Sequence, residues 1–222
     1  MRQTSSKYIT RFVAGVTLGL AASAGAIAAE GDVKAGADKA AMCIGCHGIP
    51  GYQNAFPEVY KVPMITGQSA KYIESALTQY HKGERKHPTM RGIAGSLSEQ
   101  DILDLAAYYG SQSNGAQLPD AAAVAPEAVA ALLTKGGCVA CHGANFSKPL
   151  DPSYPKIAGQ HPDYLYAALK AYTVTGNDLV GRNNAIMGGI AKQFTHAEMK
   201  AMAKYLGSLP GEVFTKPLER FR

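Results

Sequence analysis

A five-residue pattern, Cys-x-x-Cys-His, occurs twice in this chain of 222 residues and uses all four of its cysteines. The two copies span residues 43–47 and 138–142. Two identical sets of reactive side chains, far apart in the sequence, require a fold that presents the same chemistry at two places. This requirement constrains the chain more than its length or its overall composition does.

Segments around the two pentads also repeat in the same order. The pattern Pro-x-Ile-x-Gly-Gln occupies residues 63–68 and again 155–160. A Met-x-Gly-Ile-Ala segment at 90–94 returns at 187–191. The spacing between the copies changes by only a few residues while their order holds, which is the signature of a duplicated domain.

The duplication predicts the domain organisation of the chain. A stretch rich in Ala, with Asn-Gly and prolines, lies between the two copies and has the composition of a linker. We expect an N-terminal domain at residues 29–111, a linker at 112–125 and a C-terminal domain at 126–222.

Within each copy the apolar residues follow a helical period. Residues 69–82 and 98–109 both place apolar side chains on one face, at spacings of three and four. Ser98 is expected to cap the second of these helices, and Thr195 begins a capping box in the other copy. No convincing two-residue alternation is present, so the predicted fold class is all-α, with long loops between the helices.

The first residues have the features of an export signal. Three basic residues precede an apolar stretch at 12–20, and Ala-Ile-Ala at 26–28 fits a signal peptidase site. The apolar part is shorter than the roughly 20 residues that span a bilayer, although an uncleaved anchor is the alternative. Removal of residues 1–28 lowers the formal charge from +5 to about +2, so nucleic acid loses its main support as a partner.

Three kinds of chemistry are open to two Cys-x-x-Cys pairs in an exported protein: disulfides, a zinc site and covalent haem. Disulfides and zinc do not explain why a histidine follows the second cysteine in both copies. A thioredoxin-like redox pair would need a preceding strand, whereas helices are expected here. Cys-x-x-Cys-His is the attachment sequence of haem c, so we predict two covalent haems, held by Cys43, Cys46, Cys138 and Cys141.

The histidines of the pentads, His47 and His142, are the predicted iron ligands on one face of each haem. Met90 and Met187 align with each other in Gly-containing loops before the last helix of each copy, and they are the predicted ligands on the other face. A soft thioether favours ferrous iron and so raises the reduction potential. His87 is the serious rival, because it lies three residues before Met90, but its counterpart in the second copy is an asparagine.

The pentads, the Pro-x-Ile-x-Gly-Gln segments and the methionine loops together resemble the cytochrome c4 family of di-haem class I cytochromes c. The resemblance covers about residues 31–209. It implies two tandem class I cytochrome c domains whose haem edges approach each other, and a proline carbonyl, from Pro63 and Pro155, that accepts a hydrogen bond from each ligand histidine. The turn at 48–52 and the extra residues at 58–61 depart from the family pattern, so the resemblance does not extend to the surface around the first haem.

What the resemblance implies for function is a periplasmic electron carrier, not an enzyme. Its redox partners would be a membrane-bound, quinol-oxidising cytochrome complex and a haem–copper oxidase or reductase. No nucleic acid or small-molecule substrate is expected, and any contact with the membrane would be peripheral. The alternatives are a haem-bearing, electron-accepting subunit of a dehydrogenase complex and a di-haem peroxidase, although two iron-bound methionines argue against the peroxidase.

Basic residues gather around the first methionine, and their counterpart in the second copy has only Arg182. The gathered residues are Lys82, Arg85, Lys86, His87 and Arg91. Two interpretations stay open from the sequence: an ordinary solvated loop, or a docking site for an acidic partner steered by charge.

Overall fold

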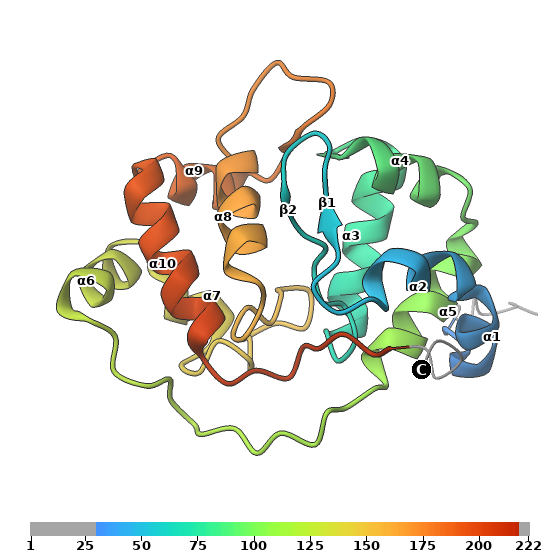
Figure 1. Ribbon diagram of the computed structural model, residues 1–222, viewed down its shortest axis with the longest axis horizontal. Helices are drawn as coiled ribbons and strands as arrows, with labels where there is room; N and C mark the ends of the chain where they lie inside the picture. The colour runs from blue at the N-terminus through green and yellow to red at the C-terminus, as the bar shows by residue number, and fades with distance from the viewer. Residues whose placement is uncertain (1–29, 218–222) are drawn as a thin grey trace, which may run out of the picture.

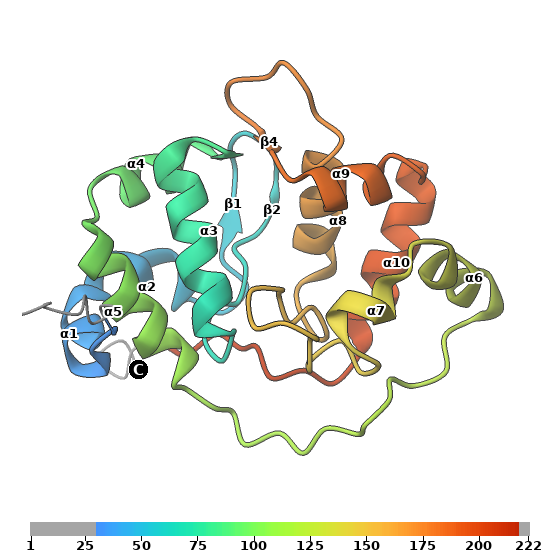
Figure 2. The same ribbon diagram turned by 180° about the vertical axis from the view of Figure 1, so that it is seen from behind.

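The computed structural model describes residues 30–217, which form two helical units side by side, joined by a long extended linker (Figures 1 and 2). The signal peptide predicted for residues 1–28 lies outside the described residues. No helix within residues 30–217 combines the length and the apolar character needed to cross a membrane.

The first unit consists of five helices that follow one another along the chain. They are α1 (Val33–Lys39), α2 (Ala41–His47), α3 (Ala70–Lys82), α4 (Pro88–Gly95) and α5 (Glu99–Gly110). The second unit repeats this order with α6 (Glu127–Lys135), α7 (Cys138–His142), α8 (Pro162–Ala171), α9 (Ala185–Ala191) and α10 (His196–Ser208). The predicted helical duplication is therefore confirmed.

The structure also contains short strands that the periodicity did not reveal. β1 (Gln53–Asn54) and β2 (Tyr60–Lys61) form an antiparallel hairpin, which lies between α3 and α8 in both views. β3 (Arg85–Lys86) of the first unit pairs antiparallel with β4 (Gly181–Arg182) of the second. Strands of two residues are too short to show an alternating pattern, so the all-α class stands.

Each unit has its own apolar core. In the first, Leu105, Ile102 and Tyr109 of α5 pack with Ile73 of α3. In the second, apolar residues of α10 pack with α8, α6 and the buried Phe146. Both capping boxes are present at the starts of α5 and α10, where Ser98 and Thr195 accept hydrogen bonds from the third helical N–H. Periodicity and capping thus positioned these helices as the sequence predicted.

The last described residues of the chain return to the first unit. The segment after α10 runs back below both units in Figure 1, and Phe214 forms a bridge with Thr66. The Phe214 N–H donates to the Thr66 carbonyl at 3.0 Å, and Lys216 donates to Gln112. Residues beyond α10 therefore contact the first unit, although they follow the second in the sequence.

The crossing of α1 over α5 depends on a glycine. Gly36 is buried, and a Cβ atom placed there would lie 2.0 Å from the backbone oxygen of Asp104 and 2.7 Å from the Cβ of Tyr108. Such distances are far inside van der Waals contact, and the atoms that they involve belong to the helix itself and cannot rotate away. The two helices can approach this closely only because residue 36 has no side chain.

We expect Gly36→Ala to destabilise the first unit by about 1–3 kcal/mol, the usual cost of overpacking. Gly95→Ala is the matched control, because nothing lies within 4 Å of a Cβ at that position. Urea unfolding of the holoprotein followed by far-ultraviolet circular dichroism measures both. Equal stability of Gly36→Ala and Gly95→Ala would show that the crossing is not this tight.

Asp104 of α5 is a buried carboxylate whose side chain is only 3% exposed. It pairs with Lys39 of α1, accepts from the backbone N–H of Asp32 at 2.8 Å and accepts from Gln100 Nε2 at 2.8 Å. The hydrogen bond from Lys39, followed by those from Asp32 and Gln100, lowers the pKa of Asp104 below its ordinary value. The charged form is therefore favoured by folding.

A carboxylate whose pKa is lower in the folded chain than in the unfolded chain stabilises the fold at pH values above its unfolded-state pKa, which is about 3.9 for Asp. That stability is lost as the pH falls through about 4 and toward the folded pKa. We expect Asp104→Asn to be less stable than wild type at neutral pH, with a difference that narrows in acid. The fully exposed Asp120 provides the control Asp120→Asn, and a constant difference between wild type and Asp104→Asn at all pH values would contradict the assignment.

Candidate functional site

Each Cys-x-x-Cys-His pentad ends or makes up a short helix. Cys43, Cys46 and His47 lie on α2, and the second pentad forms the whole of α7. Residues three and four apart share a face of a helix, so both cysteines and the histidine of a pentad project to the same side. All four cysteines are partly buried, which suits two covalent bonds to one planar group beside an imidazole.

Both pentad histidines are oriented by a proline carbonyl. His47 Nδ1 lies 2.8 Å from the Pro63 oxygen, and His142 Nδ1 lies 3.0 Å from the Pro155 oxygen. A carbonyl oxygen can only accept, so each Nδ1 must carry the hydrogen and each Nε2 keeps its lone pair for a metal. Burial lowers the pKa of both histidines, which favours the neutral imidazole that a metal requires.

The two aligned methionines begin short helices rather than lying in loops. Met90 is in the first turn of α4 and Met187 in the first turn of α9. His87 Nδ1 accepts from the Met90 N–H at 3.3 Å, and Asn184 Oδ1 accepts from the Met187 N–H at 2.9 Å. The expectation of loops at these positions is therefore wrong, because His87 and Asn184 act as equivalent N-caps.

This capping explains why a histidine and an asparagine occupy matching positions. An N-cap needs a short side chain with an acceptor atom, and both residues supply one. Burial lowers the pKa of His87 and so favours the neutral ring, and the hydrogen bond from the Met90 N–H requires the tautomer whose proton is on Nε2. The alignment of the two copies places Asn184 opposite His87, and this pairing is the signal in the sequence that could have indicated the cap.

Two arginines meet at the boundary between the units. Arg85 of β3 lies opposite Arg182 of β4 in the strand register. Arg85 Nη2 and Arg182 Nη2 both donate to the Tyr164 hydroxyl, at 2.8 and 3.1 Å, and Arg85 Nη1 donates to the Tyr72 hydroxyl at 3.2 Å. Although burial opposes it, Arg182 and Arg85 lower the pKa of Tyr164 to about 8.

This arrangement lacks an anion among the described residues. Like charges opposite each other on paired strands are destabilising, and Arg85 is only 6% exposed. The Arg85 Nε is buried without a hydrogen-bond partner, and neither arginine forms an ion pair with an acid of residues 30–217. A cofactor with carboxylate groups fits this donor set, so the arginines, the cysteine pairs and the histidines suit haem c with its two propionates.

The basic cluster around Met90 is only partly a surface. Arg85 is buried between the units, and Lys86 donates to the backbone oxygen of Asn177 at 2.7 Å and lies 3.5 Å from the Asp178 carboxylate. Arg91 reaches the Asp178 backbone oxygen at 3.5 Å. Neither an ordinary solvated loop nor a docking site for an acidic partner describes this cluster fully, because three of its cations contact the second unit.

The described part of the chain contains no cluster of side chains that could bind a metal ion by itself. No group of three His, Cys, Asp or Glu side chains among residues 30–217 is arranged to hold one. Each pentad brings one histidine and two cysteines to one side of a short helix, the arrangement that attachment of haem c needs.

Comparisons with known proteins agree with these sites. The family model for cytochrome c matches the chain twice, over residues 33–113 and 126–210. The chain is 31% identical to cytochrome c4 of Azotobacter vinelandii, over 87% of this chain and 95% of that protein. It is also 33% identical to the thiosulfate dehydrogenase electron acceptor of Stutzerimonas stutzeri (strain A1501), over 78% of this chain and 82% of that protein.

The fold agrees with a solved structure as well. Reduced recombinant cytochrome c4 from Pseudomonas stutzeri superimposes with a TM-score of 0.59 at 27% identity, covering 81% of this chain and 100% of that one.

The cap at residue 87 can be separated from iron ligation by substitution. We expect His87→Asn to keep both the stability and the visible spectrum of the holoprotein, because an asparagine is the N-cap at the equivalent position 184. His87→Ala and Asn184→Ala should each lose about 0.5–2 kcal/mol in denaturant unfolding. A change of iron ligation in His87→Asn would instead make His87 a ligand.

Proposed function

Since the chain belongs to the cytochrome c4 family of electron carriers and carries two covalently bound haem c groups, we propose that it is a periplasmic carrier in a respiratory chain. It takes single electrons from a membrane-bound, quinol-oxidising cytochrome complex and passes them to a terminal oxidase or reductase. Residues 1–28 direct its export, and residues 112–125 link the two haem-bearing domains, 29–111 and 126–222.

The observation that carries this proposal is the matched set of side chains in the two units. Cys43 and Cys46 would hold the first haem through thioethers, and Cys138 and Cys141 would hold the second. His47 and His142, which the prolines orient, would each bind one iron. Met90 and Met187, at equivalent capped helix starts, would supply the second protein ligand of each iron.

Bound haem c supplies an iron that changes between ferric and ferrous states. With one histidine and one methionine of the chain bound to each iron, no coordination position would stay open for a substrate. The role of the chain is to hold the ligands still, exclude water and compensate the propionates with Arg85 and Arg182. Fixed ligands keep structural change between redox states small, which suits outer-sphere transfer.

Rigidity at the boundary between the domains supports transfer from one haem to the other. Hydrogen bonds from Arg85 and Arg182 converge on Tyr164, and β3 pairs with β4. Ion pairs also cross the boundary, between Lys170 and Glu58 and between Lys61 and Asp163. The two domains therefore hold a fixed separation without relying on the linker.

A second candidate is an electron-accepting subunit of a dehydrogenase complex. It is favoured by the relative from Stutzerimonas stutzeri, whose name describes an acceptor for thiosulfate dehydrogenase. The haem chemistry would be the same, and only the donor would differ. Co-purification of the native protein with a dehydrogenase, and reduction by that enzyme with its substrate, would favour this candidate over the respiratory carrier.

The ligand assignment is tested by a spectroscopic redox titration of wild type, Met90→Ala and Met187→Ala. Each substitution should lower the potential of one haem and remove its absorption band from methionine–iron ligation, because a thioether stabilises ferrous iron. The other haem should keep its potential and spectrum.

Met42→Leu serves as the control, since Met42 is 49% exposed and lies beside Cys43 on the attachment helix. It should titrate as wild type does. Unchanged ligation in both alanine variants would show that the sixth ligands are other residues, and peroxide turnover by wild type would turn the proposal toward an enzyme.

A further inference from the structure

Two peptide groups in the interface are each hydrogen-bonded at both ends. The Pro63–Met64 peptide accepts from His47 Nδ1 through its carbonyl at 2.8 Å, and its N–H donates to Gln160 Oε1 at 3.0 Å. The Pro155–Lys156 peptide accepts from His142 Nδ1 at 3.0 Å, and its N–H donates to Gln68 Oε1 at 2.9 Å. In both cases the histidine and the glutamine belong to different domains.

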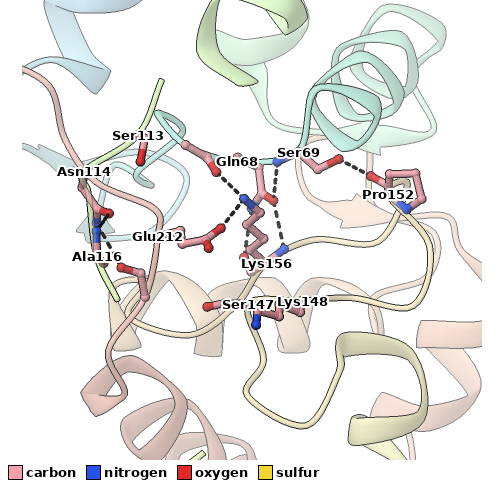
Figure 3. A network of polar contacts seen from close by, with 12 residues as sticks. Gln68, Ser69, Ser113, Asn114, Ala116, Ser147, Lys148, Pro152, Lys156 and Glu212 are labelled. Carbon is pink, nitrogen blue, oxygen red and sulfur yellow. Dashed lines mark hydrogen bonds and ion pairs between the residues drawn. The ribbon is translucent and has the colours of Figure 1, made fainter. Parts of the chain in front are cut away.

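The two glutamines hold these peptides reciprocally. Gln160 Nε2 donates to the Met64 carbonyl at 2.8 Å, and Gln68 Nε2 donates to the Lys156 carbonyl at 2.9 Å. Each side-chain amide thus makes two hydrogen bonds to one residue of the opposite domain, as Figure 3 shows for Gln68 and Lys156. Both glutamines are 4% exposed, so water does not compete for these bonds.

The orientation of both amides is determined by their surroundings. Gln68 Oε1 also accepts from the Ser69 N–H at 2.9 Å, and Gln160 Oε1 accepts from the His161 N–H at 3.0 Å. A rotated amide would place its NH₂ group against two N–H donors, which is unfavourable. Gly67 and Gly159, with φ of 79° and 73°, form the left-handed turns immediately before the glutamines.

Hydrogen bonds in a chain polarise one another, strengthening each by about 10–30%. A bond to the N–H of the Pro63–Met64 peptide makes its carbonyl oxygen a stronger acceptor. The His47 Nδ1–H bond then strengthens, and the imidazole becomes a better donor to iron, as other partners of ligand histidines make it. A better donor favours ferric iron, so the reduction potential falls.

We propose that Gln160 and Gln68 are positioning residues that tune the haem of the opposite domain. Gln160, in the second domain, acts on the first haem through Met64, Pro63 and His47. Gln68, in the first domain, acts on the second haem through Lys156, Pro155 and His142. This inference rests on the proposed function only in taking His47 and His142 as iron ligands.

The test compares Gln160→Met and Gln68→Met with wild type in the holoprotein. Methionine approximates the shape of glutamine but removes both hydrogen bonds to the opposite domain, together with the one from the N–H of the following residue. We expect each variant to raise the potential of the opposite haem, changing its reduction equilibrium about two- to fivefold, the scale of weakening one hydrogen bond. In the NMR spectrum of the reduced protein, the Nδ1–H proton of the opposite histidine should move upfield.

Ser69→Ala is the matched control. It removes a neutral hydrogen bond across the same interface, from Ser69 Oγ to the Pro152 carbonyl (Figure 3). The hydrogen bonds of the Pro63–Met64 and Pro155–Lys156 peptide groups are left in place. It should leave both Nδ1–H signals in place. Gln160→Glu keeps an acceptor oxygen for the Met64 N–H, so it should not raise the potential of the first haem even if Gln160→Met fails to fold.

Several results would overturn the inference. They are equal shifts of both haems, a shift confined to the haem of the mutated domain, or a rise in Gln160→Glu equal to that in Gln160→Met. Failure of the proposed function would be seen separately, as unchanged iron ligation in both Met90→Ala and Met187→Ala. Loss of methionine ligation in those two variants, with unchanged potentials in both glutamine variants, would reject the cross-domain effect alone.

Discussion

The structure depends on one hydrogen bond that occurs once in each domain, from a histidine Nδ1–H to a proline carbonyl. It selects the imidazole tautomer, leaves Nε2 available to iron and orients the ring. The attachment helix and the loop that carries the proline must both be in place for this bond to form. Helix packing, capping and the close crossing at Gly36 are therefore preconditions of the iron site as well as of stability.

The same loop also forms the boundary between the domains, so ligand geometry and domain association are not independent. Residues 63–68 and 155–160 supply the prolines, and they also supply the glutamines that reach across the interface. Elsewhere along the boundary, Arg85 of the first domain and Arg182 of the second place positive charge around Tyr164. A carrier with two centres gains from this arrangement, because the path between them is held by the elements that hold each centre.

Features carried by residue type and spacing could be predicted from the sequence. The pentads, the repeated prolines and methionines, the main helices and both capping boxes belong to this group, because each is a local pattern. The buried role of Arg85, the reciprocal glutamines and the extended pairing of β3 with β4 could not be predicted. They depend on how one domain is placed against the other, and a repeat such as Gly-Gln shows only that a residue recurs. His87 is an intermediate case. Its alignment with Asn184 can be read from the sequence, but the sequence also allows His87 to be an iron ligand, so the capping role is clear only from the structure.

The return of the chain to the first domain has a consequence for the order of assembly. Phe214, which bridges to Thr66, follows both pentads in the sequence. Synthesis proceeds from the N-terminus, so this contact cannot form until both cysteine pairs have left the ribosome. The contact between the C-terminal segment and the first domain therefore forms after the thiols have become available for modification. The direction of translation determines this order.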